Sequence, residues 1–299
     1  MLWLYDLLVN PFVEFGFIRR ALVGALLLSL SACPVGVFLT LRRMSLVGDA
    51  MSHAVLPGAA IGFLLYGLEI IPMTLGGMVA GLVVAIGAGV VSRLTVQKED
   101  ASMAAFYLIS LALGVLIVSL RGSSVDLMHV LFGSVLALNA EALILIASVS
   151  AISLLALTLL WRALIAECLD PLFLRAVSRL GSPVHFLFLT LVVINLVAGY
   201  QALGTLLSVG LMILPAVTAR FWTRRVITLC LVSVLIGMVA CISGLLFSYH
   251  YSLPSGPAII LANGVLYLAS TGVAMMRNAR RHPHASFASL VNTRPSRTE

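Results

Sequence analysis

Charged residues are scarce in this sequence: they form 10% of its 299 residues, whereas an ordinary soluble domain has roughly 25%. Hydrophobic residues make up 61% of the chain. So little charge leaves no stretch polar enough for a separate soluble domain. The composition excludes a soluble globular protein and indicates a chain that crosses a membrane several times.

Cysteines are also few, and two common catalytic and nucleotide-binding motifs are missing. The chain has no H-E-x-x-H motif and no Walker A loop. We therefore expect no enzyme and no permanently bound cofactor, and any ATP would be bound by another polypeptide. The N-terminal MLWLYDLLVNPF lacks a basic n-region and a cleavage site, so we expect no removable signal peptide. Four scattered cysteines form no C-x-x-C pair and predict neither disulfides nor a zinc site: Cys33, Cys168, Cys230 and Cys241.

Apolar stretches close to the ~20 residues that span a bilayer recur along almost the whole chain. We predict an all-α, polytopic membrane protein with nine transmembrane helices in one domain, residues 21–276. Residues 1–20 should form an amphipathic lead-in, and residues 277–299 a basic, disordered cytoplasmic tail. Residues 125–138 are too short to cross and should form an interfacial or re-entrant helix. The predicted spans are 21–41, 46–68, 72–92, 102–120, 141–161, 184–200, 203–221, 226–248 and 257–276.

The basic residues predict the orientation, because lysine and arginine in short loops stay on the cytoplasmic side. With nine spans and the C-terminus inside, fifteen of the 18 basic residues fall on that side. Only Arg19, Arg20 and Arg121 fall outside. We therefore predict an outside N-terminus and a cytoplasmic C-terminus. The net charge of +7 follows from this topology, and no nucleic acid is expected as a partner.

One break between spans is long and polar: RALIAECLDPLFLRAVSRLGSP, residues 162–183, on the predicted cytoplasmic side. Its Asp-Pro pair suits the start of a helix and its Gly-Ser-Pro suits the end, with an amphipathic stretch between them. Such a helix could be a docking surface for a partner or only an interfacial connector. The candidate docking residues are Asp170, Pro171, Leu174, Val177 and Gly181.

The stretch RRMSLVGDAMSHAVLPG, residues 42–58, puts Asp49 and His53 just inside a predicted span. Residues four apart share one face of a helix about 6 Å apart along its axis, so a carboxylate and an imidazole can approach one ion together. This pair of ligands suits zinc, manganese or ferrous iron. His53 lies ten residues beyond Arg43, about 15 Å of helix, which is near the middle of a ~30 Å hydrocarbon core.

Neighbouring residues would support such a site. Pro57 has no amide hydrogen for the carbonyl of His53, which leaves that oxygen as a candidate ligand. Gly48 lets another backbone come close. Gly58 and Gly62 form a G-x-x-x-G packing face.

Both side chains also have structural alternatives. Asp49 could cap its helix or pair with Arg42 or Arg43. His53 could bond a carbonyl in the bundle. An ionised group at the bilayer centre costs about 2.5 to 3.5 kcal/mol on insertion scales, so such groups usually have a function. The residues alone leave both interpretations open.

Longer strings around this pair resemble a known family. GVFLTLRRMSLVGDAMSHAVLPGAAIGFLL, residues 36–65, is similar to the signature of the membrane permeases of zinc, manganese and iron ABC importers. In that family Gly-Asp-x-x-x-His-x-x-x-Pro-Gly lies in the second helix. VDLMHVLFGSVLAL at 125–138 and GTLLSVGLMILPAVTARFW at 204–222 resemble the same family in the same order. The resemblance covers about residues 17–277.

The resemblance implies a type II ABC-importer-like permease that works as a homodimer in the bacterial cytoplasmic membrane. Two cytoplasmic ATPase subunits would bind ATP and grip its coupling helices, and a periplasmic or lipid-anchored binding protein would deliver zinc, manganese or ferrous iron. Carried over to matching positions, Asp49 and His53 become the metal ligands of the translocation path. Residues 170–180, within 163–183, become the coupling helix.

Other polar residues receive no role from the resemblance. In FSYHYSLPSGPAIIL, residues 247–261, Ser252 stands where the family often has an acidic residue, and His250 is not assumed to replace it. Left open as further metal sites are Asp126 with His129, and His282 with His284 in the tail.

A secondary carrier that exchanges metal for protons is the alternative function. It could also place an Asp-His pair at the midplane. It would leave the helix within 163–183 without a partner, and such carriers commonly show repeated, broken helices. The permease subunit of an ATP-driven importer is therefore the favoured function.

Overall fold

The computed structural model describes residues 13, 15–67, 69–96, 98–120, 138–169 and 181–281. These residues form α-helices joined by short connections, and no strand occurs among them, so the predicted all-α class is confirmed. The helices are α3 (Gly16–Leu41), α4 (Val47–Ala54), α5 (Leu56–Tyr66), α6 (Ile70–Leu94), α7 (Glu99–Leu120), α9 (Ala140–Leu169), α11 (Gly181–Leu203), α12 (Thr205–Ala219), α13 (Val226–Tyr251) and α14 (Ser255–Arg281).

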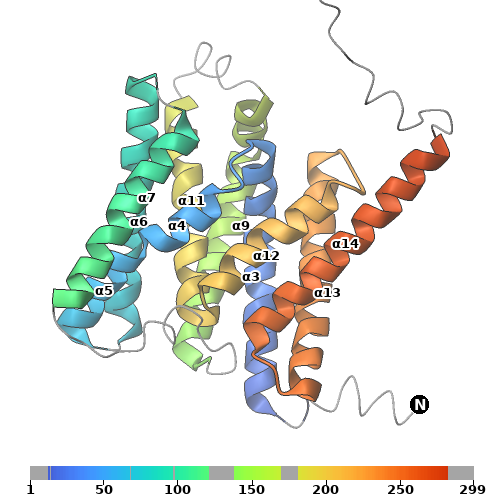
Figure 1. Cartoon of the computed structure of the whole chain (residues 1–299), viewed down its shortest axis with the longest axis horizontal. Coiled ribbons are helices and arrows are strands. Elements are labelled where there is room, and N and C mark those ends of the chain that lie inside the picture. The colour runs from blue at the N-terminus through green and yellow to red at the C-terminus, as the bar shows by residue number, and fades with distance from the viewer. Residues whose placement is uncertain are drawn as a thin grey trace, which may run out of the picture.

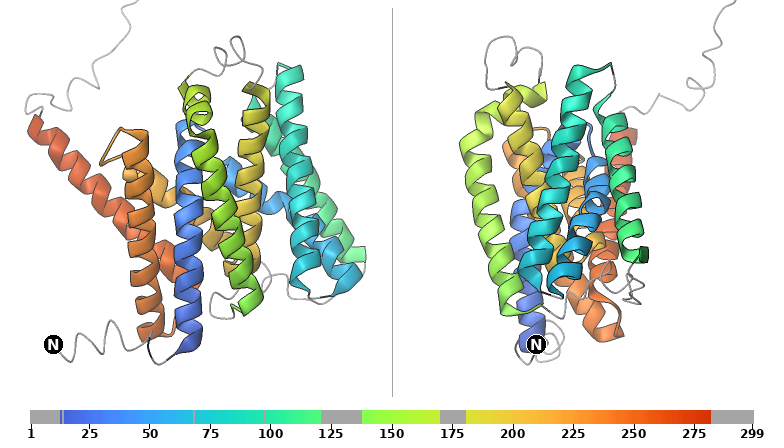
Figure 2. Two further views of the ribbon diagram at one scale, coloured as in Figure 1. Left: turned by 180° about the vertical axis from the view of Figure 1, so that it is seen from behind. Right: turned by 90° about the vertical axis from the view of Figure 1, so that its left-hand side faces the viewer.

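The helices form two layers (Figure 1, Figure 2). In one layer α13, α3, α9, α11 and α6 stand side by side in that order, and neighbours in the row pack against each other. In the other layer α4 and α12 cross this row obliquely, with α7 beside α4 and α14 beside α12. Because α12 also packs across both α3 and α11, these two are the most buried of the long helices.

Side chains are distributed as in a helical bundle that faces lipid. Large apolar residues point outward along the long helices, and Val79, Leu159 and Leu268 are each more than half exposed. Small residues lie where helices cross. A Cβ at Gly36 would collide with the backbone carbonyl of Met212, so α3 and α12 can approach this closely only at a glycine.

The predicted G-x-x-x-G face packs against α6. A Cβ at Gly58 would collide with the carbonyl of Gly76, and a Cβ at Gly62 would come too close to the carbonyl of Pro72. The backbones of α5 and α6 therefore touch at these positions, which larger side chains would prevent.

The helix boundaries differ from the predicted spans at several ends, and α14 continues as a helix to Arg281, into the predicted disordered tail. α3 begins at Gly16, five residues before the predicted start of the membrane domain. The predicted span 46–68 is two helices separated at Val55. The predicted span 203–221 is the 15-residue α12, which at 1.5 Å per residue is too short to cross ~30 Å. With α4 and α5 taken together, eight helices in the described ranges are long and apolar enough to cross a membrane.

Most described basic residues lie at one end of the bundle, which we name the basic end. At this end lie the C-terminal ends of α3, α6, α9, α12 and α14 and the N-terminal ends of α4, α7, α11 and α13 (Figure 1). Arg19 and Arg20 lie in the first turns of α3, at the opposite end. The basic residues at the basic end include Arg42, Arg43, Arg93, Lys98, Arg162, Arg220, Arg224, Arg225 and Arg277.

The positive-inside rule predicts that the basic end faces the cytoplasm. A cysteine replacing the exposed Thr95 at the basic end should react with a membrane-impermeant maleimide only in inverted vesicles. A cysteine replacing the exposed Ser252 at the other end should react only in whole cells. The parent chain is the control, because its four cysteines are buried or only partly exposed. The reverse labelling pattern would invert the topology.

Candidate functional site

The four-residue spacing brings Asp49 and His53 together on one face of α4. Nε2 of His53 lies 4.0 Å from Oδ1 of Asp49. α4 crosses the bundle obliquely between its two ends (Figure 1). In the single chain the Asp49 side chain is 68% exposed and the His53 side chain is 40% exposed. One copy of the chain therefore leaves this polar face uncovered.

The surroundings of the pair include a second carboxylate and an aromatic ring. A hollow of about 200 Å³ lies beside Asp49, between α4 and the start of α7. Asp100, Met103 and Tyr107 line it on the α7 side. The ring centroid of Tyr107 lies 6.4 Å from that of His53. α7 thus forms one wall beside the pair.

The helix that carries the pair ends just after His53. Val55 separates α4 from α5, and Pro57 lies in the first turn of α5. Pro57 therefore offers no N–H to the carbonyl of His53. That carbonyl instead shares the N–H of Val55 with the carbonyl of Met51. The carbonyl of Ala54 accepts a hydrogen bond from the Ser110 hydroxyl of α7 at 2.9 Å. The break is thus part of the packing of α7 against α4 and α5.

Among the described residues, Asp49 neither caps its helix nor forms an ion pair with Arg42 or Arg43. α4 has no side-chain cap hydrogen bond at its N-terminus. Arg42, one expected partner, instead donates to Glu167 of α9 at 2.8 Å. The backbone approach predicted at Gly48 is not found: the nearest atoms to a Cβ there belong to side chains of α12, with Ile213 at 3.2 Å.

One chain offers few ligands to a metal ion. Within the described residues, no group of three or more His, Cys, Asp or Glu side chains is arranged to hold one. Asp49 and His53 would supply two ligands, whereas transition metals take four or more. Further ligands would have to come from water or from a second chain. The assignment of both residues as metal ligands stays a prediction.

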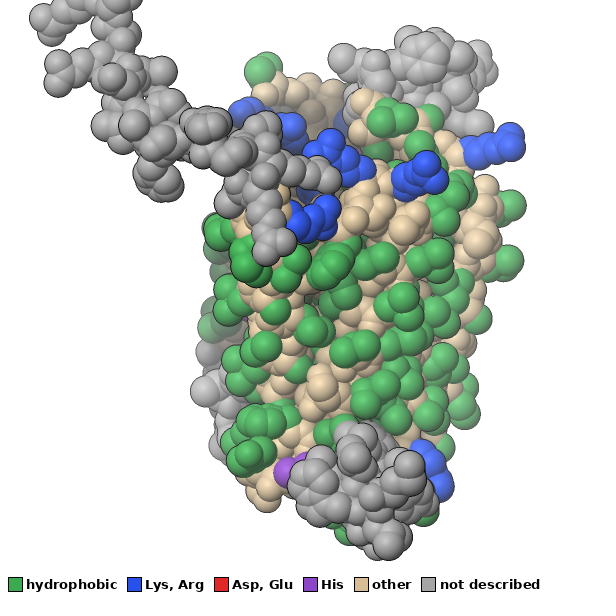
Figure 3. All heavy atoms as spheres, turned by 90° about the vertical axis from the view of Figure 1, so that its right-hand side faces the viewer, with side chains coloured by type: hydrophobic (Ala, Val, Ile, Leu, Met, Phe, Trp, Pro, Cys, Tyr) green, Lys and Arg blue, Asp and Glu red, His purple; other side chains and the backbone are tan. Residues whose placement is uncertain are grey.

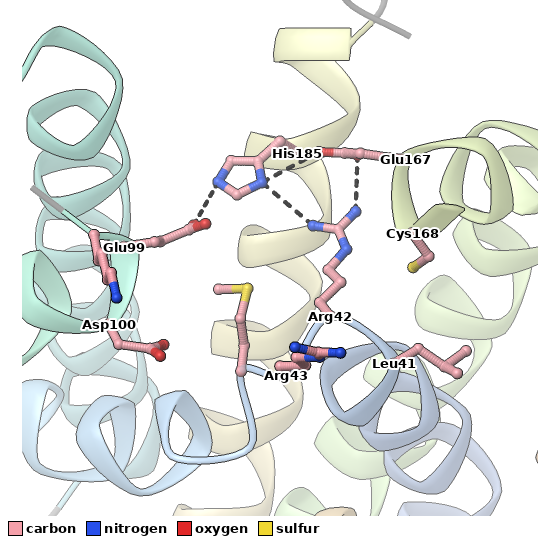
Figure 4. Close-up of a pocket in the computed structure, with 10 residues that line it drawn as sticks. Leu41, Arg42, Arg43, Glu99, Asp100, Glu167, Cys168 and His185 are labelled. Carbon is pink, nitrogen blue, oxygen red and sulfur yellow. Dashed lines mark hydrogen bonds and ion pairs between the residues drawn. The ribbon is translucent and has the colours of Figure 1, made fainter. Parts of the chain in front are cut away.

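A second polar cluster joins four helices at the basic end (Figure 4). Nε2 of His185 is 2.8 Å from Oε1 of Glu99. Nδ1 of His185 is 3.3 Å from Oε1 of Glu167 and 3.3 Å from Nη1 of Arg42. We name this cluster the charge network; its members are Arg42 after α3, Glu99 of α7, Glu167 of α9 and His185 of α11.

The charge network is largely withdrawn from water. The side chains of Arg42, Glu167 and His185 are each 7% exposed or less. The guanidinium carbon of Arg42 also lies 4.2 Å from the ring centroid of Phe188. With His185 protonated, two cations, Arg42 and His185, would balance two carboxylates, Glu99 and Glu167. Buried charges require such pairing. The network therefore fixes the ends of α3, α7, α9 and α11 relative to one another, beside a cavity of about 380 Å³.

A family model confirms the resemblance drawn from the sequence motifs. The model described as the ABC 3 transport family matches residues 14–274, which is most of the chain. The chain belongs to the ABC 3 transport family. The Asp49–His53 pair, the break between α4 and α5, and the apolar helices are thus found in a member of that family.

Two relatives carry the names of metal transport systems. This chain is 33% identical over 278 residues to the manganese import system permease protein ScaB of Streptococcus parasanguinis, covering 93% of this chain and 98% of ScaB. It is 29% identical over 296 residues to the chelated iron transport system membrane protein YfeD of Yersinia pestis, covering 98% of each chain.

Solved structures show the same fold. PsaBC from Streptococcus pneumoniae in complex with Fab matches with a TM-score of 0.76 and 32% identity, covering 88% of this chain and 94% of that one. A putative metal-chelate type ABC transporter in an inward-facing conformation matches with a TM-score of 0.62 at 18% identity, covering 90% and 88%. The predicted permease fold of an ABC importer is therefore confirmed.

The coupling helix expected from the family lies outside the described residues. The structure gives α9 as far as Leu169, so the first eight residues of the predicted break, 162–169, are helical. Gly181, predicted to end the coupling helix, is the first residue of α11. Outside the described residues fall Asp170, Pro171, Leu174 and Val177 of the coupling segment, and also Asp126, His129, His282 and His284.

Ser252, at the family's often acidic position, has a backbone role in this chain. It adopts a left-handed conformation with φ 52° and ends α13. Its N–H bonds the carbonyl of Ser248, whose hydroxyl donates to the carbonyl of Leu253 at 2.6 Å. These contacts form the turn from α13 into α14.

The charge network is the feature that sequence reasoning missed. From the sequence alone, Arg42 is a topology signal and a possible partner of Asp49, and His185 receives no role. The sequence did contain a signal for such a cluster, because a charged residue at the end of an apolar stretch needs water or a partner. Nothing in the sequence pairs Arg42 with Glu167 or His185, however, because they lie 125 and 143 residues away.

Removing one member of the charge network should destabilise the fold. Glu167→Ala leaves the buried guanidinium of Arg42 without its carboxylate, and loss of one partner of a buried pair costs about 3 to 5 kcal/mol. We expect a lower melting temperature of the detergent-solubilised chain. Replacing Arg42 and Glu167 together by Met and Leu should cost less than Glu167→Ala alone. The control Glu141→Ala removes an exposed carboxylate and should melt like the parent. Equal melting of Glu167→Ala and the control would contradict the pairing.

Proposed function

We propose that this chain is the permease subunit of an ATP-driven importer that carries a divalent transition metal into the cytoplasm. One observation carries the proposal: an exposed Asp49–His53 pair on a broken helix, in a member of the ABC 3 transport family. A carboxylate with an imidazole suits manganese, ferrous iron and zinc. The names of the relatives favour manganese or iron. The metal is cargo, so no cofactor would be permanently bound.

A second copy of the chain would complete the pathway. If α4 were the outer surface of a single chain, an ionised Asp49 would face lipid at a cost of about 2.5 to 3.5 kcal/mol. Across a two-fold axis, two Asp49–His53 pairs would present two carboxylates and two imidazoles to one ion. Because a transport site must release its cargo, water in the remaining positions suits it better than a complete set of protein ligands.

Other polypeptides would supply the energy and deliver the metal. A cytoplasmic ATPase dimer would bind ATP at the basic end, and a periplasmic or lipid-anchored binding protein would bring the metal to the opposite end. We place the assembly in the bacterial cytoplasmic membrane, with the N-terminus outside and the C-terminus inside. The chain itself would not be an enzyme.

The charge network supports a route from the ATPase to the metal pair. Glu167 lies three residues before the proposed coupling segment, residues 170–180, and His185 lies five residues after it. Both contact Arg42, which lies seven residues before Asp49. Because these contacts are buried and charged, a displacement at the ends of α9 and α11 would be passed to the chain that leads into α4.

Substitution of the pair tests the site. Asp49→Asn keeps the size of the side chain but removes an anionic ligand, and His53→Leu removes the nitrogen. Both variants should reach the membrane and bind the ATPase, yet take up metal at least about tenfold more slowly, because even outer-sphere losses cost that much at metal sites. Uptake of radioactive manganese by cells at matched expression measures the effect.

Glu141→Gln is the matched control for this measurement, since it neutralises an exposed carboxylate in the first turn of α9. It should transport like the parent. If Asp49 has only a structural role at the start of its helix, Asn serves nearly as well as Asp. Near-normal uptake by Asp49→Asn would therefore withdraw the site.

Energy coupling is tested at the proposed coupling segment. Replacing Leu174 and Val177 together by aspartate should abolish metal uptake and copurification of the ATPase, while the permease remains in the membrane. The conservative pair Leu174→Met and Val177→Ile should keep both. Undiminished, proton-driven uptake by the aspartate variant would favour the secondary carrier instead.

A further inference from the structure

An arginine-lined hollow at the basic end has no part in the metal pair or the charge network. It measures about 660 Å³ and lies between the turn that joins α12 to α13 and the last turns of α14. We name it the arginine hollow. The residues that line it include Arg220, Phe221, Trp222, Arg224, Arg225 and Arg277.

Contacts between helices hold the arginine hollow in shape. The indole N–H of Trp222 donates to the hydroxyl of Ser270 on α14 at 3.1 Å. The ring centroid of Phe221 lies 5.7 Å from that of Tyr267, on the same helix. The α12–α13 turn is therefore fixed against α14, and the arginines on either side of the hollow keep their spacing.

The arginines of the hollow have no countercharge among the described residues. No carboxylate lines the hollow. None of its four arginines forms an ion pair within the described ranges, and Arg220 donates only weakly, to the carbonyl of Thr40 at 3.4 Å. Like charges gathered in one hollow repel, and an anion relieves that repulsion. The planar fork of each guanidinium suits phosphate oxygens in particular.

The surroundings of the hollow match those of a lipid headgroup. α13 begins and α14 ends there, and their outward faces carry the exposed Ile227, Leu231, Leu268 and Met275. Figure 3 shows basic side chains gathered at this end, above a surface that is largely hydrophobic. Trp222 is 53% exposed, and tryptophan is enriched at the boundary between lipid and water. A phosphate in the hollow would let acyl chains lie along these two helices.

We propose that the arginine hollow binds an anionic phospholipid, with Arg224, Arg225 and Arg277 around its phosphate. Basic pockets between helices on the cytoplasmic side recognise such headgroups, and the cytoplasmic leaflet carries the anionic lipids. The proposal takes its membrane orientation from the proposed function, but it does not depend on metal transport. A bound lipid would join the α12–α13 turn to the end of α14 through a shared anion.

Native mass spectrometry of the full chain in detergent tests the site. The purified permease is incubated with phosphatidylglycerol or with zwitterionic phosphatidylcholine, and the lipids retained per chain are counted. In the hollow variant Arg224, Arg225 and Arg277 are each replaced by Gln. We expect the parent to retain phosphatidylglycerol in preference to phosphatidylcholine, and the hollow variant to bind phosphatidylglycerol roughly a hundredfold more weakly, given the contribution of each interfacial arginine.

A matched variant separates this site from net charge. Replacing Arg19, Arg20 and Arg162 by Gln removes the same number of exposed arginines outside the hollow, and this variant should retain phosphatidylglycerol like the parent. Equal retention by the parent and the hollow variant would overturn the proposal. So would a loss of lipid by the matched variant as large as that by the hollow variant.

Two other ligands would give different results. If inorganic phosphate binds the parent as tightly as phosphatidylglycerol does, the hollow recognises a free anion and the lipid proposal fails. If the hollow variant keeps its lipid but loses the ATPase or the second copy of the chain, the arginines form a protein contact and the proposal also fails. Metal uptake is not measured here, so either failure is distinct from a failure of the proposed permease function.

Discussion

Asp49 and His53 lie side by side on a face of α4 that one copy of the chain leaves open. In a membrane such a face needs water or protein against it, because an ionised side chain in hydrocarbon is costly. This constraint is consistent with the place of α4, which crosses obliquely between α7 and α12 and lies outside the row of parallel helices (Figure 1). In the proposed dimer the same constraint makes the uncovered face a shared path for the metal.

Neighbouring helices supply hydrogen-bond and charge partners for the polar groups in and near α4. In lipid every backbone group must be paired inside the protein, yet Pro57 removes one donor from its helix. The carbonyl of His53, to which Pro57 cannot donate, shares the N–H of Val55, and the Ser110 hydroxyl of α7 donates to the next carbonyl, that of Ala54. Gly114 brings α7 so close that a Cβ there would lie 3.2 Å from the nitrogen of Pro57. At the basic end the charge network supplies partners for a buried charge. Arg42, which precedes α4, contacts side chains of α9 and α11.

Features that depend on local pattern could be predicted from the sequence, and those that depend on tertiary contacts could not. Apolar length gave the long helices, and four-residue spacing gave the shared face of Asp49 and His53. Hydropathy does not mark helix ends, so α12 is shorter than its apolar stretch and α9 continues through Arg162 to Leu169. Near the end of α9, Glu167 has a buried partner in Arg42, just after α3, and that pairing joins residues 125 positions apart.

Electron paramagnetic resonance of manganese bound to the purified permease is the most direct test of the central claim. If Asp49 and His53 of two copies hold the ion, one manganese should bind per two chains, and its spectrum should show coupling to an imidazole nitrogen. That coupling should disappear in His53→Leu. Nitrogen coupling that survives His53→Leu, with unchanged affinity for manganese, would contradict the assignment of this pair as the translocation site.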